Sequence, residues 1–330
     1  MRVPSWKSII VIVAAGAAFY LVMAILTDID KIAQAFKEFS WLFFAPVLVL
    51  VAFNYLIRAE RWHIFLARVG LGLPRGRSYR IFLSGLSMSA TPGKVGEALK
   101  AVLLRTERGA AIERGIGIVF VERLSDLTGM LVLIGIGIFA LPYGVLSFIV
   151  MFVVVAGIIA LVTSRRLSGK LISWLKGRKR LNVIGNALEA PLRDSSELLS
   201  GRSLLQGTVY STMGWAAECL AFFVILAGSS AGVGLIQSVF IYAFSSVIGA
   251  ISMLPGGMGT TEATMVGMLL LQGTAAYVAS FAVILTRVAT LWFAVAVGVV
   301  FLAMYSKRSQ AIDEPAQSTG VLESPGEGEK

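Results

Sequence analysis

The sequence is poor in the residues that build disulfides and metal clusters. It has one cysteine, Cys219, and one histidine, His63, among 330 residues. A single cysteine excludes a disulfide within the chain, and the two residues leave too few ligands for a His or Cys metal cluster. Cys219 has no neighbouring cation in the sequence to stabilise a thiolate, so we interpret it as a small buried residue. We therefore expect no metal site, no redox chemistry and no cofactor.

Charged residues are also scarce. They make up 15% of the chain, against 57% hydrophobic residues and a mean hydropathy of +0.82. A water-soluble core cannot absorb that apolar fraction, so the composition predicts an all-α polytopic membrane protein. Each span must satisfy its own backbone hydrogen bonds, and the sequence lacks the alternation of a strand barrel. We interpret the net charge of +10 as cytoplasmic loop charge, and expect no nucleic-acid partner.

The charges between the apolar runs predict the orientation of the chain. Two apolar stretches contain a Pro-Gly break. Stretch 79–104 has basic residues at both ends, and stretch 235–271 is uncharged at both ends. Because the two ends of each stretch are alike, we expect re-entrant hairpins of broken helices. Both termini and the basic segment 164–203 are predicted to be cytoplasmic, in the cell membrane, with residues 28–40 and 142–144 outside. Six full spans are expected near residues 8–26, 41–58, 114–141, 145–163, 204–227 and 275–305.

The two Pro-Gly breaks are similar in sequence. SATPGKVGEALK runs from Ser89 to Lys100 and SMLPGGMGTTEA from Ser252 to Ala263, and an arginine follows the glutamate of each by about 25 residues. We interpret this as an inverted repeat, with chance similarity in a glycine-rich chain as the alternative. The first repeat is residues 1–141 and the second 142–303, followed by a disordered tail, 304–330. The helix-break residues are Pro92, Gly93, Gly96, Pro255, Gly256, Gly257 and Gly259.

Several charged residues fall inside the predicted spans. Glu122, Arg123 and Asp126 lie near mid-membrane, where each charge costs about 2.5–3.5 kcal/mol unless it is paired or hydrated. The i,i+3 spacing of Arg123 and Asp126 allows an ion pair within the helix. Arg287 has no acidic neighbour in its own span and needs a partner from another one; the candidates are Glu97, Glu218 and Glu262. These charges either bind substrate or only cross-link helices.

An arginine fork suits phosphate as well as carboxylate, and half-helix N-termini after the two breaks would direct backbone donors to the same place. We therefore predict that Arg123 and Arg287 form an anion clamp, which Glu97 and Glu262 hold in the absence of lipid. By contrast, Arg58, Glu60 and Arg61 are interpreted as interfacial anchors. The candidate substrate-binding residues are Lys94, Glu97, Glu122, Arg123, Asp126, Glu218, Glu262 and Arg287.

The basic segment RRLSGKLISWLKGRKR, residues 165–180, spaces its apolar residues at helical intervals. It is interpreted as a loop that sets the topology, with a helix lying on anionic headgroups as the alternative.

Four stretches together resemble a known family: RAERW at 58–62, SATPGKVGEALK, VERLSD at 121–126 and MLPGGMGTTEA at 253–263. They are similar to the flippase-like transmembrane region of lysylphosphatidylglycerol synthases and their stand-alone relatives. The resemblance implies movement of an anionic phospholipid or a polyprenyl-linked sugar between leaflets. Nothing in the sequence resembles an aminoacyl-transfer or glycosyltransferase domain, so lysyl-lipid synthesis is not expected.

Three functions therefore remain open. The first is a flippase-like lipid transporter, which is not an enzyme. The second is a non-transporting partner that scaffolds a lipid synthase or a glycosyltransferase. The third is a membrane-embedded enzyme acting on lipid phosphate, which the sequence disfavours because it shows no nucleophile with a base and no metal-ligand spacing.

Overall fold

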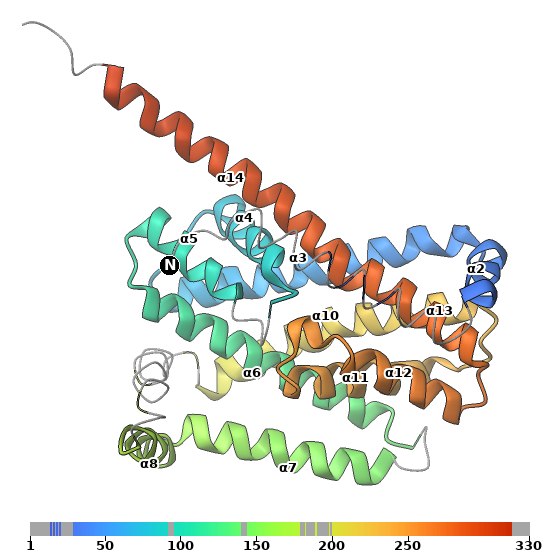
Figure 1. The fold of residues 1–330 in the computed structure, drawn as a ribbon. Coiled ribbons are helices and arrows are strands. Elements are labelled where there is room, and N and C mark those ends of the chain that lie inside the picture. The colour runs from blue at the N-terminus through green and yellow to red at the C-terminus, as the bar shows by residue number, and fades with distance from the viewer. Residues whose placement is uncertain are drawn as a thin grey trace, which may run out of the picture.

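The structure is a computed structural model, and its described residues form helices and no strands (Figure 1). It describes residues 29–91, 96–139, 144–178 and 200–318, with the isolated positions 14, 16, 18, 20, 182, 189 and 198. Most of the expected first span, 8–26, and the outer turn at 142–143 therefore lie outside the described residues. The predicted helical class is confirmed for the part of the chain that can be described.

The elements follow one another as a series of helices of very different length. In chain order they are α2 (Ile29–Glu38), η1 (Trp41–Phe43), α3 (Phe44–Arg68), α4 (Arg75–Gly85), η2 (Leu86–Met88), α5 (Leu99–Arg108), α6 (Ile112–Ile136), α7 (Gly144–Thr163), α8 (Arg165–Lys176), α10 (Gly201–Gly228), α11 (Leu235–Ile251), η4 (Pro255–Gly257), α12 (Thr260–Leu271), α13 (Ala276–Arg287), the π-helical η5 (Val288–Trp292) and α14 (Phe293–Ser318).

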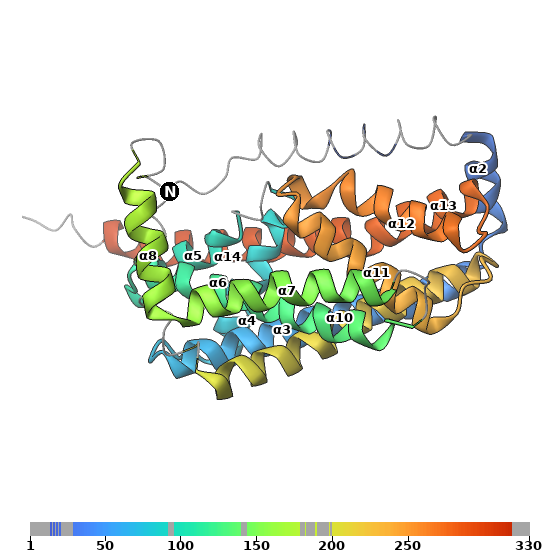
Figure 2. The same ribbon diagram turned by 90° about the horizontal axis from the view of Figure 1, so that it is seen from below.

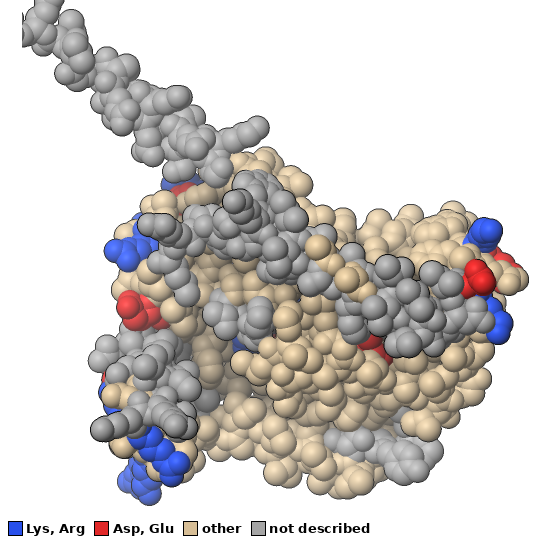
Figure 3. All heavy atoms as spheres, viewed as in Figure 1, with Lys and Arg blue, Asp and Glu red and all other residues tan. Residues whose placement is uncertain are grey.

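Three helices among the described residues are long and apolar enough to cross a membrane: Trp41–Arg68, Gly201–Gly228 and Ala276–Tyr305. A fourth span is possible if the helices Phe148–Leu161 and Arg166–Lys176, which meet at 84°, count as one. On the face shown in Figure 3, most of the charged side chains lie at the two ends, and the described surface between them is mostly uncharged apart from two small charged spots. This distribution fits helices that run from one membrane surface to the other.

Two segments between the predicted spans, 28–40 and 165–180, contain helices. The linker after residue 28 contains α2, whose Ile32 is buried and which packs against α13. The basic segment contains α8, which turns away from the end of α7 (Figure 2). In both segments the apolar residues recur at helical spacing, so a helix gathers them on one face. The interpretation of 165–180 as a loop is therefore wrong. α14 also continues to Ser318, into the segment expected to be disordered.

The second Pro-Gly break interrupts a pair of helices that pack against each other, α11 and α12. Pro255 begins a single 3-10 turn, and Gly256, Gly257 and Gly259 all have positive φ, which side chains rarely adopt. Met253 also has a positive φ of 56°. We call α11, η4 and α12 the second helical hairpin, and residues 252–259 its tip.

The first helical hairpin consists of α4, η2 and α5, which also pack against one another. Pro92, Gly93 and Lys94 lie outside the described residues, so its tip is seen only at 89–91 and 96–98. There Ala90 joins Leu291 and Val295 in a small apolar cluster. A Cβ atom built on Gly256 would lie 3.5 Å from the Cα of Ala90, so the two tips meet, as the sequence predicts.

A glycine in the last span lies against the first hairpin. A Cβ atom on Gly298 of α14 would lie 1.9 Å from the backbone nitrogen of Ser87 in η2. Only hydrogen fits there, so the backbones of α14 and η2 touch where α14 crosses the first hairpin.

Candidate functional site

A cavity of about 480 Å³ lies where the two tips meet the long helices. Three arginines and three carboxylates line it, while much of the remaining wall is apolar, including Leu127, Met130, Ile158 and Leu254. The lining residues come from both hairpins and from α3, α6, α7, α10, α13, η5 and α14. The charged lining residues are Arg58, Glu97, Arg123, Asp126, Glu218 and Arg287. The cavity therefore offers both charged and apolar surface to a lipid headgroup in one place.

We define the α3–α6 charge cluster as Arg58, Arg61, Glu97, Lys100, Glu122, Arg123 and Asp126. Asp126 is its centre. Its Oδ1 accepts from Nη1 of Arg61 at 2.7 Å and from Nε1 of Trp215 at 3.1 Å. Its Oδ2 lies 3.3 Å from Nη1 of Arg123 and 3.5 Å from Nη2 of Arg58. One carboxylate thus contacts three guanidinium groups, one of them through the i,i+3 pair expected within α6.

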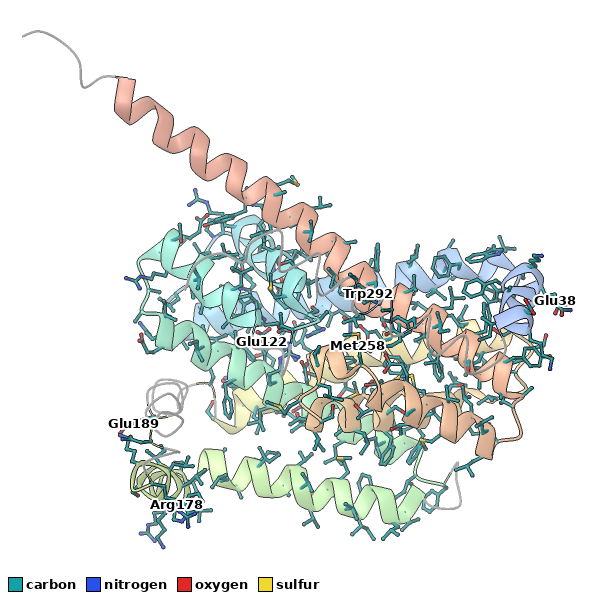
Figure 4. The ribbon with its side chains drawn as sticks, in the orientation of Figure 1. Glu38, Glu122, Arg178, Glu189, Met258 and Trp292 are labelled. Atoms are coloured by element: carbon teal, nitrogen blue, oxygen red, sulfur yellow. The ribbon has the colours of Figure 1, made fainter. Side chains whose placement is uncertain are left out.

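Lys100 of α5 lies on the other side of this cluster. Its Nζ donates to Oε2 of Glu122 at 2.6 Å and lies 3.5 Å from Oε2 of Glu97. The ammonium group also lies 5.0 Å from the ring centroids of both Trp62 and Phe82. Carboxylates and aromatic faces together replace the water that the buried ammonium has lost. Glu122 lies in the interior of the molecule, whereas Glu38 and Glu189 lie at its ends (Figure 4).

A second, smaller charge group lies at the tip of the second hairpin. Nε of Arg287 donates to Oε1 of Glu262 at 2.7 Å, and its Nη2 donates to the carbonyl oxygen of Gly256. Oε1 of Glu262 also accepts from the Tyr20 hydroxyl at 2.8 Å, and its Oε2 accepts from the backbone N–H of Gly259 at 2.8 Å. Glu262 is the third residue of α12, so it caps the start of that helix while holding Arg287.

The π-helical turn η5 follows Arg287 directly. The hydroxyl of Tyr55 on α3 donates to the carbonyl oxygen of Thr290 at 2.8 Å, which ties this turn to the long span beside it. π-helical turns expose backbone carbonyls and often occur at functional sites. Across the cavity, Glu218 of α10 accepts from the hydroxyl of Tyr242 on α11 at 2.5 Å. Glu262, rather than Glu218, is therefore the carboxylate bonded to Arg287.

The two predicted Arg–Glu pairs are both present. Nη2 of Arg123 donates to Oε2 of Glu97, as Arg287 donates to Glu262. Each pair joins the span after a break to the helix start beside that break. Gly96 lies at the first tip, where its N–H donates to Oγ1 of Thr91 at 2.9 Å. Thus all candidate substrate-binding residues except Lys94 are described, and each belongs to the α3–α6 charge cluster, the Arg287–Glu262 pair or the cavity wall.

The interpretation of Arg58 and Arg61 as interfacial anchors is wrong. Their exposed fractions are 6% and 1%, and both are paired with Asp126. Glu60, which points the other way, does pair with Arg75 at 3.0 Å in a more exposed position. Lys100, only 2% exposed, is a further site residue that the sequence did not single out. The missed signal was the i,i+3 spacing of Arg58 and Arg61, which places both on the face of α3 that is buried.

Buried charges are thus abundant in this small interior. Among the described residues, five cations and five carboxylates are buried or partly buried around the cavity. They are Arg58, Arg61, Lys100, Arg123 and Arg287 with Glu97, Glu122, Asp126, Glu218 and Glu262. No group of three His, Cys, Asp or Glu side chains in the described part of the chain is arranged to hold a metal ion.

Sequence comparisons find relatives that match between 60% and 88% of this chain. A UPF0104 membrane protein of Methanothermobacter thermautotrophicus is 23% identical over 298 residues, covering 84% of this chain and 87% of the relative. A second UPF0104 membrane protein of that organism is 22% identical over 317 residues, covering 88% and 93%. A UPF0104 membrane protein of Methanocaldococcus jannaschii is 26% identical over 213 residues, covering 60% and 84%.

The family match extends across both hairpins and the cavity between them. Residues 9–298 match the lysylphosphatidylglycerol synthase TM region, which confirms the resemblance drawn from the four sequence stretches. The chain is therefore a helical membrane protein that belongs to the family of the lysylphosphatidylglycerol synthase TM region.

Proposed function

We propose that this protein moves a lipid with a phosphate-bearing headgroup, an anionic phospholipid or a polyprenyl-linked sugar, between membrane leaflets. The supporting observation is the cavity at the meeting point of the two tips, with arginines and carboxylates in an otherwise apolar wall. Charged groups inside a membrane cost about 2.5–3.5 kcal/mol each, and they mark substrate pathways by default. Charged residues that only cross-linked helices would not need a cavity of headgroup size beside them.

The ion pairs suggest how such a site exchanges its contents. Without lipid, Glu97 and Glu262 satisfy Arg123 and Arg287. A phosphate presents the same oxygen geometry to a guanidinium fork, so it can take the place of a carboxylate without leaving a cation unpaired. The proposed role is transport rather than catalysis, with membrane lipids as ligands.

The fold suggests how the path is built. We propose six full spans and two re-entrant hairpins, related as inverted repeats over residues 1–141 and 142–303, in the cytoplasmic membrane with both termini inside. The equivalent positions of the two Arg–Glu pairs and the contact between the tips support this arrangement. Inverted repeats with broken helices place their sites near the bilayer midplane, where alternating access moves the surrounding halves.

A leaflet-resolved assay tests the proposal. The purified protein is placed in liposomes with head-labelled phosphatidylglycerol or polyprenyl phosphate in both leaflets, and a membrane-impermeant quencher removes the outer label. Translocation appears as quenching of more than the outer half of the label. Asp126→Asn should abolish it, and Glu189→Gln, which changes a charge pair at the molecule's end, should not. If neither lipid crosses faster than in protein-free liposomes, the proposed function is wrong.

A further inference from the structure

The three arginines that line the cavity are not equally committed to protein partners. Arg287 uses its Nε for Glu262 and its Nη2 for the Gly256 carbonyl. In Arg58 and Arg123, by contrast, Nε is buried and has no hydrogen-bond partner among the described residues. A buried donor left unpaired costs about 1–3 kcal/mol, and more when it is charged. Nε and Nη2 of Arg61, behind the wall, are likewise buried and without a hydrogen-bond partner among the described residues, so the α3–α6 charge cluster as a whole is short of acceptors.

Arg58 is more unusual than Arg123. Its guanidinium carbon lies 5.2 Å from the ring centroid of Trp215 and 5.9 Å from that of Phe82. Its nearest carboxylate oxygen, Oδ2 of Asp126, is 3.5 Å away. Aromatic rings hold the plane of a guanidinium group while leaving its N–H edge available for an anion. Arg58 is therefore positioned by packing more than by charge pairing.

The charge balance limits what can bind there. Among the described residues around the cavity, cations and carboxylates are equal in number, and the charge of Glu218 also acts on Arg58. Arg61 and Lys100 lie behind the wall, and only Arg58 and Arg123 of the four cations of the α3–α6 charge cluster reach the cavity. A single negative charge bound at these two arginines would therefore take over the role of one carboxylate.

We infer that Arg58 and Arg123 form the anion subsite of the cavity, for a phosphodiester headgroup with a single negative charge, and that Arg287 is a positioning residue. This inference rests on the proposed function. The phosphate accepts from the guanidinium groups of Arg58 and Arg123 and replaces Glu97 at Arg123, while Leu127, Met130 and Ile158 contact the apolar part of the lipid. Arg287 ties the start of α12 to the Gly256 carbonyl and so holds the second tip in place.

Binding to the full chain in a non-ionic detergent tests this division of roles. The probes are dihexanoylphosphatidylglycerol, inorganic phosphate and dihexanoylglycerol, measured by titration calorimetry. Arg58→Gln and Arg123→Gln should each weaken dihexanoylphosphatidylglycerol binding about 10–100-fold, the range of a lost hydrogen bond to a charged group. Arg287→Gln combined with Glu262→Gln removes one whole pair and should weaken binding by a smaller factor than either Arg58→Gln or Arg123→Gln.

Arg58→Lys is a second variant that tests the subsite if the glutamine variants do not fold. It keeps the charge between the two rings but loses the flat N–H edge, so it should fold with a normal unfolding midpoint and bind at least about fivefold more weakly. Wild-type affinity in Arg58→Lys and Arg123→Gln would overturn the inference. So would a loss in the Arg287/Glu262 double variant as large as in Arg58→Gln. Equal affinity for inorganic phosphate and the lipid would overturn the assignment to a lipid headgroup.

The translocation assay separates this inference from the proposed function. If Arg58→Gln and Arg123→Gln abolish lipid binding but wild-type protein moves no lipid, the subsite stands and the transport function fails. If wild-type protein moves lipid and both variants do so at the same rate, the transport function stands and the subsite fails.

Discussion

Asp126→Asn removes one carboxylate from the centre of the α3–α6 charge cluster while keeping the side chain's size. Asp126 accepts from Arg61 and Trp215 and lies within 3.5 Å of both Arg58 and Arg123. The change raises the excess positive charge of the described cluster from one to two, and an amide N–H replaces one acceptor. We therefore expect the folded protein to lose stability.

The size of that loss follows from the burial of the partners. Breaking a buried ion pair by removing one partner costs about 3–5 kcal/mol, which is a large part of the roughly 5–15 kcal/mol that stabilises a typical fold. At about 2 °C per kcal/mol for a chain of this size, the midpoint of thermal unfolding in detergent should fall by about 6 °C or more.

A matched carboxylate-to-amide exchange at an exposed pair is the control. Glu189 accepts from Nζ of Lys176 at 2.5 Å, but its side chain is 51% exposed. Exposed pairs contribute about 0–1 kcal/mol, so Glu189→Gln should shift the unfolding midpoint by no more than about 2 °C. An Asp126→Asn variant that unfolds as close to wild type as this control would refute the ion-pair network around Asp126.

Three further predictions concern the tip, the crossing and the orientation. Arg287→Lys should lower the unfolding midpoint and lipid translocation together, because one ammonium group cannot reproduce both bonds of the guanidinium. Neutralising Glu262 as well should recover stability. Loss of translocation without loss of stability would contradict this prediction. Gly298→Ala should lower the free energy of unfolding by about 1–3 kcal/mol, because its Cβ would meet the η2 backbone. Gly267→Ala, where the added Cβ meets open space, should leave the unfolding midpoint unchanged. Equal midpoints for the two variants would contradict the contact between α14 and η2. Lys170→Cys, in a chain whose native cysteine is serine, should react with an impermeant maleimide only from the cytoplasmic side, and labelling only from outside would disprove the proposed topology.

Some features of the fold and the site could be predicted from local sequence, and others could not. The break at Pro255 was predictable because proline lacks the N–H that a helix requires and the following glycines tolerate positive φ. The pairing of Arg123 with Asp126 was predictable from their spacing in one helix. The burial of Arg58 and Arg61 was misjudged, because the positive-inside pattern describes basic residues near a span end without saying which face they occupy.

The sequence alone thus determined that the chain is a helical membrane protein and where the second helical hairpin breaks, because composition and missing donors act locally. The tertiary structure decided which charges are partners and which line a cavity. Glu262 rather than Glu218 bonds Arg287, and Arg58 stacks between Phe82 and Trp215, only because of how α3, α4, α10, α12 and α13 are rotated against one another. That rotation depends on the packing of the whole interior, and no single stretch of sequence specifies it.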